Sequence, residues 1–255
     1  MIRSKESVVL RVIRGGKVVK EVRVKGNTLT SAFLTWFRKE LTGTYERYDM
    51  KQMNYIKLYS SSDVIGSATI TSSDISYELS AHRVSVSKNV YVTASAFLTD
   101  VGIGNVDGET YTEITKLTLS TPLAVSSGDY VSVTYEGVFD ASITNLSGLL
   151  SDADYTAEPL VWEIIRRLAQ QTPQSVTIKK VELLDQYFVT QLSVDCQNDN
   201  SNYIIKIPET TLSTSITVKH IRLVNYSNNY MVQFSKASAV TLPAGSRVSL
   251  SIGVM

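Results

Sequence analysis

The stretches VSSGDYVSVTYEGV at residues 125–138 and LPAGSRVSLSIGV at residues 242–254 decide the fold. Each consists of an apolar residue, a turn that contains glycine, and a strand in which apolar and small polar residues alternate. Such alternation is typical of a β-strand with one buried face. Two endings of the same kind in one chain indicate a repeated β unit.

Further pairs of similar segments occur in the same order before these endings. The sequence FLTWFRKEL at 33–41 aligns with PLVWEIIRRL at 159–168, and one slip places the only two tryptophans, Trp36 and Trp162, at equivalent positions. Any two β-hairpins share some of this pattern, but the agreement in order favours a duplication. The matched strand segments are residues 56–58 with 181–183 and residues 114–119 with 218–223.

A short helix is expected at the start of each unit. In the first unit, apolar side chains recur at helical spacing and are followed by Gly43. The stripe consists of Leu29, Phe33, Trp36, Phe37 and Leu41, after a cap at Asn27 or Thr28. In the second unit, Thr156 is the expected cap, Pro159 lies in the first turn, and Pro173 stops the helix.

These patterns predict a mainly β fold made of two tandem β-sandwich or jelly-roll-like units, each preceded by a short α-helix, plus an N-terminal β-hairpin. We expect the hairpin, the first helix and the first unit at residues 1–140, a linker at 141–155, and the second helix and unit at 156–255. The patterns leave open whether the units are separate domains or one merged body. The glycine-rich run at 102–108 lacks the lysine and the following helix of a phosphate loop, and predicts a long turn.

Composition excludes several classes of protein. The 255 residues carry a formal net charge of +1, which gives no general attraction to nucleic acid. One cysteine, Cys196, excludes an intrachain disulfide and a cysteine-built zinc site. Two histidines, His82 and His220, are too few for a multi-histidine metal centre. No pattern indicates a catalytic site, a cofactor or a metal, so we expect a protein that is not an enzyme.

The sequence also bears on where the protein is made. The first residues run directly into an alternating strand, without the apolar segment of a secretory signal. No stretch reaches the roughly 18–20 apolar residues that span a bilayer. We therefore expect synthesis and folding in the cytoplasm and no membrane span.

The N-terminal hairpin carries a basic patch. The turn Arg14-Gly15-Gly16-Lys17 joins residues 8–13 to residues 18–24, in a register that pairs Ile13 with Val18 and Arg11 with Lys20. Paired cations need a solvated face or acidic partners, so we expect this face to contact other protein copies. Without interleaved aromatic residues, any contact with nucleic acid would be a weak one, to phosphates alone. The cations are Arg11, Arg14, Lys17, Lys20, Arg23 and Lys25.

The order of these features resembles virion structural proteins of tailed phages and archaeal viruses. The likeness is carried by the basic hairpin, the sequence WFRKEL at 36–41, the strand NYIKL at 54–58, and a Ser/Thr-rich unit that ends at 119–135. The resemblance implies a structural role in a capsid, as a vertex, decoration or minor capsid protein, or in a tail. It also implies homo-oligomers, contacts with other virion proteins, and location in the virion after synthesis in the host cytoplasm.

A carbohydrate- or receptor-binding β-sandwich module is the alternative. Tyrosine combines a large contact area with a polar tip, which suits protein interfaces and sugars. Trp36 and Trp162 would be stacking platforms in this alternative, but both lie in apolar helix stripes, where we expect them to anchor the helices on the sheets. Several of the fourteen tyrosines form two groups, Tyr45, Tyr48, Tyr55 and Tyr59, and Tyr203, Tyr226 and Tyr230.

Overall fold

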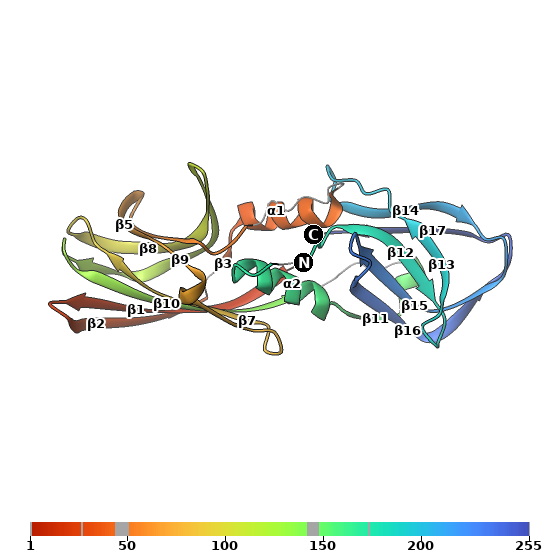
Figure 1. Cartoon of the computed structure of the whole chain (residues 1–255), viewed down its shortest axis with the longest axis horizontal. Helices are drawn as coiled ribbons and strands as arrows, with labels where there is room; N and C mark the ends of the chain where they lie inside the picture. The colour runs from red at the N-terminus through yellow and green to blue at the C-terminus, as the bar shows by residue number, and fades with distance from the viewer. Residues whose placement is uncertain (1, 27, 44–50, 142–147, 173, 255) are drawn as a thin grey trace.

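The computed structural model describes residues 2–26, 28–43, 51–141, 148–172 and 174–254. The body is elongated, with a β lobe at each end and two short helices between the lobes (Figure 1). These helices are α1 (Ser31–Thr42) and α2 (Glu158–Leu168). The predicted mainly β fold with two helices is therefore confirmed for the described part of the chain.

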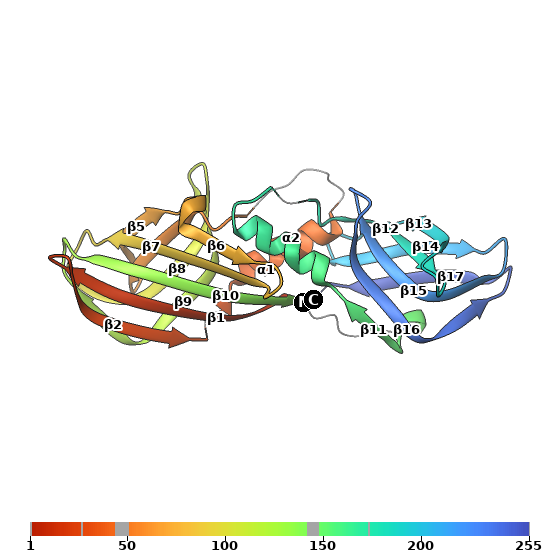
Figure 2. The ribbon, with the colours of Figure 1, turned by 60° about the horizontal axis from the view of Figure 1, so that its bottom comes forward.

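The first lobe consists of two antiparallel sheets that pack face to face (Figure 2). One sheet has the strand order β3-β9-β8-β4-β5 and the other β2-β1-β10-β7-β6. The N-terminal hairpin is part of this lobe, because β1 pairs with β10 as well as with β2. The strands are β1 (Ile2–Arg14), β2 (Lys17–Lys25), β3 (Thr28–Leu29), β4 (Tyr55–Ser60), β5 (Asp63–Thr69), β6 (Ile75–Glu78), β7 (Arg83–Tyr91), β8 (Ala96–Asp107), β9 (Thr110–Val125) and β10 (Tyr130–Ala141).

The second lobe follows the same plan with fewer strands. A five-stranded antiparallel sheet has the order β11-β16-β15-β12-β13, and β14 pairs with β17 in a second, smaller sheet. The strands are β11 (Ala153–Thr156), β12 (Ile178–Leu184), β13 (Thr190–Asp195), β14 (Ile204–Thr211), β15 (Ile216–Asn225), β16 (Tyr230–Leu242) and β17 (Arg247–Gly253).

The two lobes match strand by strand. Each has a short edge strand before its helix, β3 or β11, which pairs with the long strand β9 or β16. The order β3-β9-β8-β4-β5 therefore corresponds to β11-β16-β15-β12-β13, and β10-β7 corresponds to β17-β14. The first lobe adds β1, β2 and β6 to its second sheet. The shared order is the result expected of a repeated unit.

One of the predicted correspondences is wrong. Residues 114–119 lie in β9, whose counterpart is β16, whereas residues 218–223 lie in β15, whose counterpart is β8. Both strands are interior members of similar sheets and both alternate with period two. The period alone therefore cannot distinguish neighbouring strands.

The helix starts also differ from the prediction. The cap of α1 is Thr30, whose Oγ1 accepts a hydrogen bond from the backbone N–H of Phe33, while Thr28 belongs to β3. The residue before α2 is Ala157, and Thr156 belongs to β11. In both cases a strand pairing occupies the predicted cap. Gly43 is the C-cap of α1 and Pro159 lies in the first turn of α2, as predicted, whereas Asn27 and Pro173 lie outside the described residues.

Part of the segment 141–155 that was expected to be a linker is built into the second lobe. A 3-10 turn at Gly148–Leu150 buries Leu150, and β11 then pairs with β16. Lys236 is 5% exposed; it donates a hydrogen bond to the Leu149 carbonyl and pairs with Asp152. Residues 142–147 lie outside the described part.

The helices join the lobes in an approximately two-fold arrangement. Helix α1 packs on β9 of the first lobe and reaches β14 of the second. Helix α2 packs on β16 of the second lobe and reaches β7 and β10 of the first. Because β14 corresponds to β7, each helix contacts its own lobe and the equivalent strand of the other. The buried apolar side chains form one cluster that includes both lobes and both helices.

Two hydrogen bonds repeat this symmetry at the ends of the helices. The Thr177 hydroxyl, just before β12, donates to the carbonyl of Glu40 at 2.7 Å. The Met53 N–H, just before β4, donates to the carbonyl of Leu168 at 3.1 Å. Each bond links the residues just before the strand that follows one lobe's helix, β4 or β12, to the last turn of the other lobe's helix, so the lobes hold one another in place.

Candidate interaction surfaces

The N-terminal hairpin turns at Gly15 and Gly16, which have φ angles of +53° and +76°. The predicted pairing of Ile13 with Val18 is confirmed. An irregularity between Val12 and Ile13 then shifts the register, so that Arg11 lies opposite Glu21 instead of Lys20. The predicted repulsion between Arg11 and Lys20 is therefore wrong, and an attractive pair takes its place.

Three of the six cations of the basic patch form ion pairs with carboxylates of the same chain. Arg11 and Arg23 both bind the carboxylate of Glu21, at 2.7 and 3.0 Å, and this lowers the pKa of Glu21. Arg14 binds both carboxylate oxygens of Asp129, at 2.8 and 2.7 Å, and these hydrogen bonds lower the pKa of Asp129 to about 2. The remaining three cations, Lys17, Lys20 and Lys25, are exposed and lack a carboxylate partner within the described ranges.

These three lysines lie on β2, an edge strand. Among the described residues β2 pairs with β1 alone, so its other side is open. Val18 and Val19 on the same strand are each 55% exposed. An open edge with exposed valines can pair with a strand of another chain. Lysines on the edge oppose pairing with a strand that is also basic.

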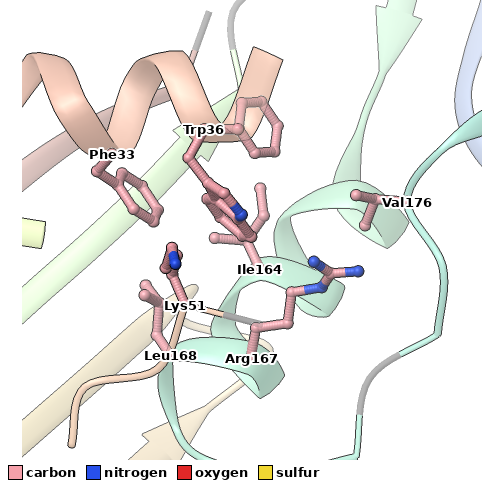
Figure 3. Close-up of a pocket in the computed structure, with 8 residues that line it drawn as sticks. Phe33, Trp36, Lys51, Ile164, Arg167, Leu168 and Val176 are labelled. Carbon is pink, nitrogen blue, oxygen red and sulfur yellow. The ribbon is translucent and has the colours of Figure 1, made fainter. Parts of the chain in front are cut away.

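Trp36 packs in the junction between the helices (Figure 3). Its ring centroid lies 5.4 Å from that of Phe33, and the Arg167 guanidinium of α2 lies 5.7 Å from its ring. The adjoining space is lined by Phe37, Ile164 and other side chains and is too narrow for a water molecule. Trp36 therefore packs α1 toward α2, whereas the sequence suggested packing onto a sheet.

The two tryptophans are not equivalent in the structure. Buried side chains with matching spacing, Phe33, Phe37 and Leu41 in α1 and Leu160, Ile164 and Leu168 in α2, define the correspondence of the helices. In this alignment of the helices, Trp36 is equivalent to Glu163 and not to Trp162. The neighbouring position of Trp162 is rotated by about 100° around the helix axis. Trp162 is half-buried, and its Nε1 lacks a hydrogen-bond acceptor among the described residues. Its role as an anchor stays a prediction.

A buried ion pair lies beside Trp36. The Arg167 side chain is 1% exposed, and its Nη1 lies 3.2 Å from Oε2 of Glu40 on α1. Arg167 also donates to the carbonyl of Gln174 at 3.3 Å. A charge this deeply buried is stable only when its partners are in place. The pair therefore fixes the position of one helix against the other.

In the sheet β3-β9-β8-β4-β5 of the first lobe, side chains of β9 lie across the outer face of β8. Gly102 and Gly104 lie in β8, which continues to Asp107, so the predicted long turn at 102–108 is wrong. A Cβ atom at Gly104 would lie 2.6 Å from a ring carbon of Tyr111, and one at Gly102 would overlap the Glu113 carboxylate. The glycines make room for Tyr111 and Glu113 to lie across the strand.

Lysines cover the tyrosine rings of this face. The Lys57 ammonium is 4.0 Å from the centroid of Tyr111, and that of Lys116 is 5.1 Å from the centroid of Tyr59. Burial raises the pKa of Tyr59 to about 12 and also raises the pKa of Glu113. A sugar would have to displace these ammonium groups before it could stack on the rings, which disfavours this face for the carbohydrate alternative. Tyr45 and Tyr48 lie outside the described residues.

The second lobe presents an apolar turn between β12 and β13. Tyr187 is 76% exposed, Val189 55% and Phe188 48%. The Asp185 carboxylate accepts hydrogen bonds from the N–H groups of Tyr187 and Val189, at 2.8 and 3.0 Å. Phe188 has a φ of +62°, a strained conformation for an aromatic residue, and such strain is often found at functional turns.

Side chains on the neighbouring strands support this turn. Phe188 stacks on His220 with ring centroids 4.1 Å apart, and the Arg222 guanidinium lies 5.2 Å from Phe188. Arg222 also lies 4.7 Å from the ring of Tyr230, which is 38% exposed. The apolar turn is therefore held in a defined position. No sequence pattern marked residues 187–189, because exposure of apolar residues at a turn is not visible from periodicity.

The two histidines and the cysteine, which are the residues most often used in catalysis, lie in packed or turn positions. Burial, with the nearby Lys219 and Arg222, lowers the pKa of His220, whose ring stacks on Phe188. Burial raises the pKa of the Cys196 thiol to about 12, so it is not a thiolate near neutral pH. His82 has a φ of +51° and lies in the turn before β7. The described residues contain no group of three or more metal-ligating side chains, and none of their helices is long and apolar enough to cross a membrane.

Comparisons with protein families, with curated proteins and with solved structures find no match to this chain.

Proposed function

We propose that the chain is a non-enzymatic virion structural protein that acts through protein-protein assembly contacts. It would be a capsid-associated protein, as a vertex, decoration or minor capsid component, or a tail component. The observation that carries the proposal is the presence of exposed apolar side chains at fixed positions in both lobes. Apolar clusters on a folded surface are typical of sites that become covered by a partner.

Three such clusters support the proposal. Val18 and Val19 lie on the edge strand β2. Tyr91 and Tyr130 pack edge-to-face, 5.4 Å apart, on β7 and β10, and are 48% and 45% exposed. The apolar turn at residues 187–189 is the third. Clusters in both lobes allow one copy to contact more than one neighbour, which a component of a regular assembly requires.

The junction between the lobes favours the same role. Paired helices, a buried ion pair and two interlobe hydrogen bonds fix the relative position of the lobes. Contact surfaces in different lobes therefore keep a constant separation and angle. The viral context rests on the resemblance in the order of hairpin, helix and Ser/Thr-rich unit, and the proposed partners are other copies and other virion proteins.

Mass spectrometry of purified virus particles, from cells that carry the gene, tests the proposal. We expect peptides of the chain in the particle fraction, at a constant ratio to the other particle proteins. Light scattering of the purified chain should show defined oligomers. A chain that is strictly monomeric and absent from particles would refute the proposed function.

A receptor- or carbohydrate-binding role is the second candidate. The observation that favours it is the cluster of Tyr187, Phe188 and Tyr230 around Arg222. Aromatic rings beside a guanidinium suit both sugars and protein receptors. A glycan array probed with the full chain and with Tyr187→Ala distinguishes the candidates: binding to a defined glycan that the substitution abolishes would favour this role.

A further inference from the structure

Among the strand edges of the two lobes, β2 and β13 differ most clearly in chemistry. One edge strand of the first lobe is β2, which among the described residues pairs with β1 alone. One edge strand of the second lobe is β13, which within the described part pairs with β12 alone. The helices separate the two lobes that carry these strands (Figure 1). One copy therefore presents the two edges to different neighbours.

The charges of the two edges are complementary. Residues 17–25 contain three lysines and one arginine, and their single acid, Glu21, already binds Arg11 and Arg23. On β13 itself the charged residue is the exposed Asp195. The flanking Asp185 and Asp199 lie before and after the strand, with Asp199 3.7 Å from Lys206. Two β2 edges would bring lysines together and two β13 edges would bring aspartates together. Pairing between unlike edges is the arrangement that these charges favour.

Apolar residues on both edges are incompletely covered in a single copy. Val22 and Val24 of β2, and Leu192 and Val194 of β13, point toward the core but are only partly buried. Val18 and Val19 lie at the start of β2, and the apolar turn at 187–189 directly precedes β13. An added strand would cover these side chains and would satisfy the open backbone groups of both edges.

We infer that β2 of one copy pairs with β13 of the next copy. This inference deepens the proposed assembly function and rests on it. The contact joins two different surfaces, so an open row of copies keeps one unused β2 edge and one unused β13 edge, and it either closes into a ring or extends as a filament. Lysines on β2 exclude like edges and select the acidic edge of a neighbouring copy.

Charge reversal tests the pairing with the full-length chain. Lys20→Glu/Lys25→Glu makes the β2 edge acidic, and Ser193→Lys/Asp195→Lys makes the β13 edge basic. All four side chains are exposed and none forms an ion pair within the described residues. Lys39→Glu/Arg247→Glu is the matched control, because it changes the net charge as much as the β2 variant but lies on α1 and β17, which belong to neither of the two sheets that carry these edges.

We expect multi-angle light scattering to show wild type and the control as multiples of the 28.2 kDa chain, with a mass that rises with concentration. Each edge variant alone should be monomeric. An equimolar mixture of the two should assemble again, because the acidic β2 of one meets the basic β13 of the other. Circular dichroism of each variant shows whether the fold is retained.

The outcomes distinguish this inference from the proposed function. Edge variants that assemble like wild type, or a mixture that stays monomeric while wild type assembles, would overturn the pairing and leave the assembly function in place. Wild type that is monomeric but present in virus particles also overturns the pairing alone. Wild type that is monomeric and absent from particles overturns both.

Discussion

Removal of the Glu40 carboxylate should destabilise the whole chain, because it leaves the Arg167 charge buried without its counterion. The Arg167 side chain is 1% exposed and that of Glu40 is 13% exposed. Breaking a buried pair from one side costs about 3–5 kcal/mol. Because Arg167 keeps a hydrogen bond to the Gln174 carbonyl, we expect Glu40→Ala to lose about 3 kcal/mol, at the lower end of that range.

Urea unfolding, followed by circular dichroism and by tryptophan fluorescence, measures this loss. Both tryptophans lie on the junction helices, so fluorescence reports on the junction and circular dichroism on the sheets. We expect one transition by both probes, and a drop in the melting temperature of about 2–4 °C for each kcal/mol lost. The apolar double variant Glu40→Leu/Arg167→Met should recover most of the loss, since buried ion pairs can be replaced by well-packed apolar side chains.

The exposed pair Arg247–Glu209 provides the control. Its side chains are 71% and 58% exposed, and Arg247→Ala should change the unfolding free energy by less than about 1 kcal/mol. If Glu40→Ala costs no more than this control, or if the two probes show separate transitions in the wild type, then the ion pair does not join the lobes.

Three further predictions concern the first lobe. Gly104→Ala should cost about 1–3 kcal/mol in urea unfolding, because its Cβ would overlap the Thr112 carbonyl and Tyr111, whereas Gly253→Ala, with open space around it, should cost far less; equal costs would contradict the crowding. Asp129 has a pKa of about 2 in the folded chain against an ordinary 3.8, so the stability that it contributes is present above pH 4 and is lost as the pH falls toward 2. Asp129→Asn should therefore reduce the difference in stability between pH 6 and pH 3, and an unchanged difference would argue against the Arg14 pair. Because the pKa of Tyr59 is about 12, Tyr59→Phe and wild type should form the same amount of phenolate up to about pH 11 in an absorbance titration. If the variant instead forms one phenolate fewer than wild type near pH 10, then Tyr59 titrates as an ordinary tyrosine.

Period-two alternation was enough to predict the strands and the repeat of β4 in β12. It failed where interior strands resemble one another, as with residues 114–119 and 218–223. It also failed at residues 102–108, where the sequence shows glycines but not the Tyr111 and Glu113 side chains that cross them. Strand pairing in three dimensions decides both cases.

The ion pairs of the surface and of the junction could be predicted only in part, because their partners are far away in the sequence. The sequence identified six cations on the hairpin, but not that Asp129, more than a hundred residues away, binds Arg14. A one-residue irregularity placed Glu21 opposite Arg11. Arg167 could not be predicted as buried, because its partner Glu40 comes from the other repeat. The docking of one lobe on the other is a tertiary event without a local sequence signal.

Zero-length crosslinking of lysine to carboxylate tests the central claim of assembly most directly. Unlabelled and ¹⁵N-labelled chains are mixed, crosslinked and analysed by mass spectrometry, so that links between copies carry both labels. We predict mixed-label links that join Lys20 or Lys25 of one copy to Asp195 of another. Links confined to single copies, with none between β2 and β13 of different copies, would contradict the account.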